Sequence, residues 1–213
     1  MSLSKTQLLH GLMAVIFGLS CLVESAWAGD GNQAKPGPRI PYRQDGPELG
    51  PEEVVKAIRA RRPGGKLQNL DRVLLYSPAF ARGWNSMFGA IRGELSLPPK
   101  LRELVIMAVG VLNHADYEYI QHRPEFLAAG GSEEQLKALG DVAAARDNTR
   151  LFADDERAAL ALAYEMTCHV AVTDSTMASL RKLLPDQQVV ELAGTIAGYN
   201  MVSRFLVAFG IEP

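Results

Sequence analysis

The chain has 213 residues, of which 47% are hydrophobic, and its 22 basic and 24 acidic side chains give a net charge of −2. This length suits one domain, and the composition is that of an ordinary globular protein. A nearly neutral chain without a lysine- or arginine-rich stripe argues against nucleic acid as a partner.

The first 28 residues have the three-part pattern of a secretory signal peptide. Lys5 gives a short positive region, residues 8–23 are mostly apolar, and Ala26-Trp27-Ala28 forms a small-x-small cleavage site. A single membrane anchor is the competing interpretation, but the apolar run is short for a bilayer span. We therefore expect cleavage after Ala28, a periplasmic or secreted protein, and no stable membrane span in the mature chain.

Cleavage would leave one cysteine in the mature chain. Of the two cysteines, Cys21 lies in the predicted signal peptide and Cys168 lies in an apolar segment. An internal disulfide is then impossible, even in an oxidising compartment. We interpret Cys168 as a small core residue rather than a nucleophile.

The remaining sequence predicts a helical protein. Residues 29–50 are rich in proline and glycine, which predicts a flexible segment. From residue 51 to residue 213 the apolar residues recur with helical periodicity, and no run alternates like a strand. The predicted fold is one compact all-α domain, with helices that start at or just after Pro51, Leu70, Pro78, Pro99, Asp116, Ser132, Asp154, Asp174 and Pro185.

Two helix ends have specific signals. Ser132 with Gln135 fits a capping box, and Gly210 is a typical C-terminal stop for the last helix. That last helix, residues 189–209, is apolar on more than one face, so it is either central in the domain or covered by another subunit. We expect a homo-oligomer on this basis.

Polar residues in two of the apolar segments are the candidate catalytic groups. Glu118 and His122 are four residues apart and therefore share a helix face, while Glu103 lies on the preceding helix. Carboxylates and an imidazole are costly to bury unless they pair or take part in chemistry. A purely structural role stays open, in which Glu103 pairs with an arginine and His122 lies at a subunit interface.

A metal site is a second interpretation of the same region. His114, Glu118 and His122 are spaced i, i+4, i+8, so on one uninterrupted helix they would form a stripe of potential ligands. A helix that starts at Asp116 would break this stripe.

These stretches resemble the carboxymuconolactone decarboxylase family. The resemblance rests on Leu101-Arg102-Glu103-Leu104, on Tyr117-Glu118-Tyr119 with His122, and on the later Ala129-Gly130-Gly131-Ser132, Glu156-Arg157-Ala158 and residues 199–204. It covers the chain from about residue 75 to the end, and it implies the all-α alkylhydroperoxidase D-like fold assembled as a trimer or hexamer.

The chain departs from alkylhydroperoxidase D itself, which is a dithiol antioxidant enzyme. The glutamate and histidine of that relative match Glu103 and His122, but its Cys-x-x-Cys positions are occupied by Ala115 and Glu118. Dithiol chemistry needs one thiolate to attack the peroxide and a second thiol to resolve the product. A peroxidase or peroxiredoxin activity of that kind is therefore not expected.

Tyr117-Glu118-Tyr119 resembles the decarboxylase branch of the family, which uses no metal or organic cofactor. That resemblance implies a lyase that removes carbon dioxide from a small lactone acid. His122 would be the general acid, and Glu103 or Glu118 would orient it and raise its pKa. Arg204, Asn200 and Tyr117 would bind the substrate, with Arg204 clamping a carboxylate. The alternative is a non-catalytic oligomer that kept the fold.

Export has a direct test. We expect mass spectrometry of the periplasmic or secreted protein to show a mature N-terminus at Gly29, because cleavage follows the small-x-small motif. Soluble protein that retains residues 1–28 would contradict this prediction.

Overall fold

The computed structural model describes residues 37–213. The predicted signal peptide and residues 29–36 of the predicted flexible segment lie outside this described part. Within residues 37–213 the chain forms helices joined by short turns, and no strand occurs. The prediction of an all-α fold is confirmed.

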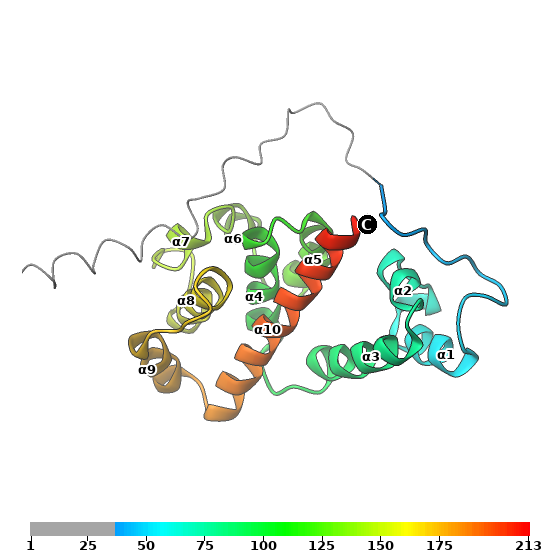
Figure 1. Cartoon of the computed structure of the whole chain (residues 1–213). Coiled ribbons are helices and arrows are strands. Elements are labelled where there is room, and N and C mark those ends of the chain that lie inside the picture. The colour runs from blue at the N-terminus through cyan, green and yellow to red at the C-terminus, as the bar shows by residue number, and fades with distance from the viewer. Residues whose placement is uncertain (1–36) are drawn as a thin grey trace, which may run out of the picture. The chain divides into compact units, whose positions relative to one another are not determined.

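Figure 1 shows the helices in chain order. They are α1 (Glu52–Arg61), the short 3-10 helix η2 (Pro63–Gly65), α2 (Asn69–Leu74), α3 (Pro78–Gly93), α4 (Pro99–Leu112), α5 (Asp116–Ala128), α6 (Glu133–Ala138), α7 (Val142–Ala145), α8 (Asp154–Cys168), α9 (Asp174–Leu183) and α10 (Asp186–Phe209).

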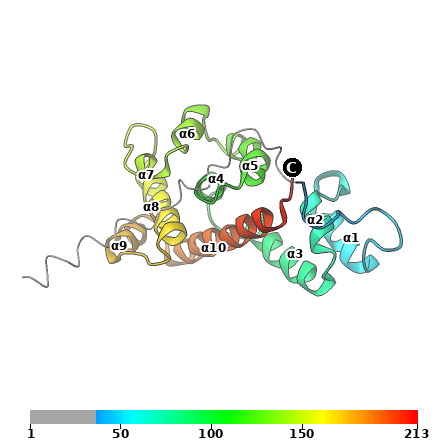
Figure 2. The ribbon, with the colours of Figure 1, turned by 45° about the horizontal axis from the view of Figure 1, so that its top comes forward.

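Helix α4 is the centre of the helical unit. It packs against α5, α8 and α10 (Figures 1 and 2), and its residues 103–110 are all buried. A helix that is apolar around its whole circumference is stable only when other helices cover it. The one polar side chain in this buried run, Glu103, is therefore held deep inside the protein.

The long helix α10 crosses the molecule beside α4, α8 and α3. Among the described helices it is the one that is long and apolar enough to cross a membrane by length and composition alone. Half of its most apolar window is buried against the other helices, as expected for a core helix. Gly210 ends α10 in the left-handed conformation, with φ 61°, as the sequence predicts.

Most predicted helix starts agree with the structure. Asp116 and Asp174 are the first helical residues of α5 and α9, and the capping positions belong to Ala115 and Thr173. The capping box at Ser132 is confirmed, because its Oγ accepts from the Gln135 amide at 3.1 Å. The sequence did not predict α7, a single turn capped by Asp141.

Residues 37–50 are irregular but make specific contacts with the helices. The Arg39 amide donates to the Phe209 carbonyl at 2.9 Å, and the Tyr76 hydroxyl donates to the Pro41 carbonyl at 3.0 Å. Leu49 at the end of this stretch is buried. These contacts join the stretch to α10 and to the turn after α2.

A sharp turn joins α4 to α5 and sets the positions of Glu118 and His122 on α5. His114 adopts a positive φ of 54°, and the Ala115 amide donates to the Gly110 carbonyl at 2.8 Å. Gly110 has no Cβ, and one built there would lie 3.2 Å from the Cβ of Glu118. Close approach of the two helices at this glycine brings Glu118 and His122 against α4.

The other end of α5 is fixed by Phe126, which packs over the turn at Gly131. A Cβ at Gly131 would lie 2.2 Å from the ring of Phe126, which is fully buried. We expect Gly131→Ala to lower the free energy of unfolding by about 1–3 kcal/mol, because the overpacked ring must move. Chemical denaturation measures the change.

Gly83 on α3 is the matched control, because a Cβ there would meet nothing within 4 Å. Gly83→Ala should leave stability unchanged or raise it by up to about 1 kcal/mol through helix propensity. Equal effects of the two substitutions would contradict this account of the α5 end.

Candidate active site

His122 and Glu103 form a buried pair between α5 and α4. The Nδ1 atom of His122 lies 2.8 Å from Oε2 of Glu103, and the side chains are 7% and 1% exposed. The other Glu103 oxygen, Oε1, accepts from Arg102 Nε at 3.1 Å. The structure thus brings together two of the three predicted catalytic residues.

The charge states of this pair follow from its surroundings. Burial alone would raise the pKa of Glu103, but the hydrogen bond and charge of His122, with Arg92 and Arg102, hold it below the usual value of 4.5. Burial lowers the pKa of His122 below 6.5, and the opposing effect of Glu103 does not overcome it. At neutral pH an ionised Glu103 therefore accepts the Nδ1 proton of a neutral imidazole.

This result corrects one expectation from the sequence. A glutamate beside His122 was expected to raise the pKa of the imidazole, and the net direction is downward. The sequence indicated the carboxylate partner but not the depth of burial, and desolvation disfavours the charged form of histidine.

Glu118 lies on the same cavity but in a different environment. It is 1% exposed, its Oε2 contacts the hydroxyl of Ser203 on α10, and its Oε1 has no hydrogen-bond partner in the described part of the chain. Burial raises the pKa of Glu118 to about 8, and the Ser203 hydrogen bond offsets only part of this increase. At neutral pH these environments favour an ionised Glu103 and a protonated Glu118.

A cavity of about 400 Å³ connects these groups to α1, η2 and α3. Glu118 and His122 line it from α5, and Tyr199 and Val202 line it from α10. An apolar wall comes from Leu70, Trp84 and Phe88. The ring of Tyr199 meets the imidazole of His122 edge to face, with centroids 5.1 Å apart, which fixes the plane of the imidazole.

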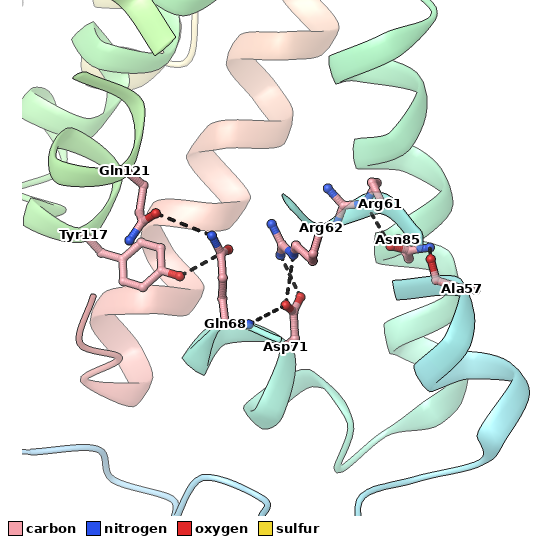
Figure 3. Close-up of polar contacts among 8 residues, drawn as sticks. All are labelled: Ala57, Arg61, Arg62, Gln68, Asp71, Asn85, Tyr117 and Gln121. Atoms are coloured by element: carbon pink, nitrogen blue, oxygen red, sulfur yellow. Dashed lines mark hydrogen bonds and ion pairs between the residues drawn. The ribbon is translucent and has the colours of Figure 1, made fainter. Parts of the chain in front are cut away.

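Three arginines line the same cavity from its other side: Arg61, Arg62 and Arg92. Arg62 is neutralised by Asp71 through two hydrogen bonds of 2.6 and 2.9 Å (Figure 3). Arg92 lies 3.9 Å from Glu125, a loose contact with a half-exposed carboxylate. The cavity therefore has more positive charge on this side than the carboxylates there compensate.

Arg61 is the least compensated of the three. Its Nε donates to the Asn85 amide oxygen at 2.8 Å (Figure 3), and no carboxylate of residues 37–213 forms an ion pair with it. Burial lowers the pKa of Arg61, and the neighbouring Arg62 lowers it further. A small anion in the cavity would relieve both effects.

Neutral polar groups complete the lining. Tyr117 donates to the Gln68 side-chain oxygen, and the Gln68 amide donates to Gln121, both at 3.4 Å (Figure 3). Burial raises the pKa of Tyr117 to about 12, so its hydroxyl stays a donor at neutral pH. Tyr117, predicted to bind substrate, does line the cavity.

Two other residues predicted to bind substrate do not line this cavity. Arg204 is exposed and donates to the side-chain oxygen of Asn200 at 2.7 Å. Asn200 in turn bonds to Asn113 and Thr167. These contacts tie α10 to the end of α4 and to α8, away from His122.

The alternative metal stripe is interrupted by the turn between α4 and α5. His114 is exposed in that turn with its positive φ, whereas Glu118 and His122 are buried on α5. Within residues 37–213 no group of three potential metal ligands comes together. Cys168 is half-buried at the end of α8 and does not line the cavity.

Comparison with known proteins identifies the segment that carries the predicted catalytic residues. Residues 78–165 match the family model described as the carboxymuconolactone decarboxylase family. This segment belongs to that family. It contains Glu103, Glu118 and His122, whereas Arg61 and Ser203 lie outside it. The resemblance predicted from the sequence is confirmed, and no curated protein matches the chain.

Solved structures support the fold. An uncharacterised peroxidase-related protein from Silicibacter sp. TM1040 is 19% identical, with a TM-score of 0.69, covering 84% of this chain and 95% of that protein. A peroxidase-related protein from Ralstonia eutropha JMP134, described as an alkylhydroperoxidase AhpD core, is 17% identical, with a TM-score of 0.70 and coverage of 84% and 94%. The debrominase Bmp8 in complex with 2,3,4-tribromopyrrole is 19% identical, with a TM-score of 0.64 and coverage of 86% and 93%. These likenesses show the alkylhydroperoxidase D-like fold.

The pairing of His122 with Glu103 can be measured without a substrate. We expect NMR titration to give His122 a pKa below 6.5, and Glu103→Gln to lower it further by removing the negative charge beside the imidazole. The wild-type protein should also lose stability as the pH falls below 6.5, because only the unfolded chain then takes up this proton.

Glu134→Gln is the control, because it removes an exposed carboxylate on α6. It should leave the titration of His122 unchanged. If Glu103→Gln also has no effect, the two side chains are not paired in solution.

Proposed function

We propose that this protein is a cofactor-free acid–base enzyme that acts on a small carboxylic acid, with decarboxylation of a lactone acid as the reaction class. The observation that carries the proposal is the buried His122–Glu103 pair beside a cavity lined with arginines. Perturbed titratable groups in a concave site are the usual mark of acid–base chemistry.

The arginines support an anionic substrate. Arg61 and Arg92 lie on one side of the cavity with weak or no carboxylate partners, and His122 lies on another. A carboxylate held by guanidinium groups would place the rest of a small molecule against Trp84 and Phe88. The assignment of carboxylate binding thus moves from Arg204 to these residues.

The histidine supports proton transfer. Because its Nδ1–H donates to Glu103, Nε2 is the atom left to exchange a proton with a ligand. Glu103 would stabilise the imidazolium whenever His122 takes up a proton, since the two groups then form a close ion pair. Glu103 acts through His122 and is therefore a positioning residue.

A dithiol peroxidase is disfavoured, although two of the similar structures are named peroxidase-related. Ala115 and Glu118 stand at the two cysteine positions of the relative, and no thiol lines the cavity in residues 37–213. A non-catalytic role leaves the uncompensated Arg61 and the paired His122 without an explanation. Export and assembly into a trimer or hexamer remain part of the proposal.

The test is an assay of turnover with a panel of small lactone acids, in which the release of carbon dioxide is measured. We expect His122→Gln to lower kcat by about two to four orders of magnitude, the usual contribution of a general acid–base group. Arg61→Gln should mainly raise KM, because it removes a contact to the bound carboxylate.

Glu134→Gln, on the exposed face of α6, is the control and should retain full turnover. Circular dichroism is used to check that each variant is folded. Full activity in folded His122→Gln protein would contradict the proposal, as would hydroperoxide turnover that Cys168→Ser abolishes.

A further inference from the structure

We propose that Glu118 is the proton donor of this site: it is a neutral carboxylic acid in the resting protein and delivers its proton to the carbanion left by carbon dioxide. This inference rests on the proposed function and assigns a step within it. It separates the roles of the two buried glutamates, which the sequence pattern treated as equivalent.

The contacts of the two carboxyl groups differ in kind. Glu103 has a cation or a proton donor at each oxygen, namely Arg102 at Oε1 and His122 at Oε2. Glu118 has one hydroxyl contact at Oε2, no partner at Oε1, and no basic side chain of residues 37–213 within ion-pair distance. A carboxylate as buried as Glu118 is not stable in the charged form with so few contacts.

The hydrogen count around Ser203 also fits a neutral Glu118. The Ser203 hydroxyl lies 2.9 Å from the Tyr199 carbonyl and also contacts Glu118 Oε2. A hydroxyl has one proton and cannot donate to both acceptors at once. If Glu118 is protonated, it donates to the Ser203 oxygen while Ser203 donates to the Tyr199 carbonyl, and both contacts are satisfied.

The pKa of about 8 for Glu118 agrees with this arrangement and has burial as its first cause. Charged and titratable groups reach the same cavity from α1, the turn into η2, α3, α5 and α10, and Glu103 approaches it from α4 through His122. None of these groups forms an ion pair with Glu118. They are Arg61, Arg62, Arg92, Tyr117, His122, Glu125 and Tyr199, together with Glu103.

His122 is not a suitable donor at rest. Its pKa lies below 6.5, so at neutral pH it has one ring proton, and that proton is donated to Glu103. A decarboxylation needs a proton in the site before the reaction begins. Of the two buried groups on this face of α5, Glu118 is the one that has such a proton.

The step balances with these groups alone. The bond between the substrate carbon and its carboxylate breaks, carbon dioxide leaves, and the electron pair stays on the carbon and delocalises into the lactone carbonyl. Glu118 then donates its proton, a C–H bond forms, and Glu118 becomes a carboxylate. A proton taken up from the solvent then returns Glu118 to the neutral acid, so each turnover consumes one solvent proton.

The first test measures stability against pH and needs no substrate. In the unfolded chain Glu118 ionises near 4.5, and in the folded protein it ionises near 8. Between these values only the unfolded chain loses the proton, so the wild type loses stability as the pH rises. Glu118→Gln keeps a neutral side chain throughout, so its Tm relative to wild type should increase over this pH range.

Glu134→Gln removes an exposed carboxylate, and its Tm difference from wild type should not change with pH in this way. Infrared spectroscopy of the wild type gives an independent measurement if Glu118→Gln folds poorly. A protonated carboxyl band should be present at neutral pH and should disappear near pH 8. Absence of the band, or a Tm difference that does not depend on pH, would overturn the assignment.

The second test is turnover, and it separates this inference from the proposed function. We expect Glu118→Gln to lower kcat by about two to four orders of magnitude with little change in KM, because an amide can bind but cannot donate an acidic proton. An active Glu118→Gln protein beside an inactive His122→Gln protein would refute this inference and leave the proposed function standing. Activity in both variants would refute both.

Discussion

Burial of ionisable groups where α4, α5 and α10 meet is the constraint on which the site depends. Helix α4 is covered on all sides, so Glu103 has no access to water and must be satisfied by protein groups. It is satisfied by Arg102 and His122, and this pairing fixes the tautomer of the imidazole. Gly110 lets α5 approach closely enough for the pairing to form. A buried charge without a partner would destabilise the fold, so the stability of this helix packing depends on the same hydrogen bonds that orient His122.

The same burial shifts the pKa values of two glutamates on neighbouring helices, Glu103 on α4 and Glu118 on α5, in opposite directions. Glu103 has compensating charge and stays ionised, whereas Glu118 has a serine hydroxyl and is driven toward the neutral acid. Environments that push the pKa values of two like groups apart are the general means by which one site holds both an acid and a base. The helix pair α4–α5 supplies both environments from a short stretch of sequence.

The sequence predicted the all-α fold and the face that Glu118 and His122 share. Helical periodicity gave most helix starts, and the i, i+4 spacing of Glu118 and His122 placed both on one face of α5. The sequence was less informative about which residues of α10 point toward the site, because a shift of one residue along a helix turns a side chain by about 100°. Tyr199 and Ser203 face the site, whereas Asn200 and Arg204, each one residue later, face away from it.

The arginines could not be predicted because they come from distant parts of the chain. Arg61 is the last residue of α1, and Arg62 follows it in the turn into η2. In the sequence, two arginines at this place look like the basic residues that commonly end a helix. Only the packing of α1 against α3, and of α3 against α10, brings them to the cavity that contains His122. Arg61 and Arg62 also lie outside the matched segment 78–165, whereas Arg92, the third arginine of the cavity, lies within it.

The central claim is that a small carboxylic acid binds between the arginines and His122. Its most direct test is a titration of the protein with small lactone and aromatic carboxylic acids, followed through the imidazole nitrogen resonances of His122 by NMR. We expect a bound acid to shift the His122 Nε2 signal, and Arg61→Gln to weaken this response severalfold. Binding that leaves the His122 signals unchanged, or that is indifferent to Arg61, would contradict it.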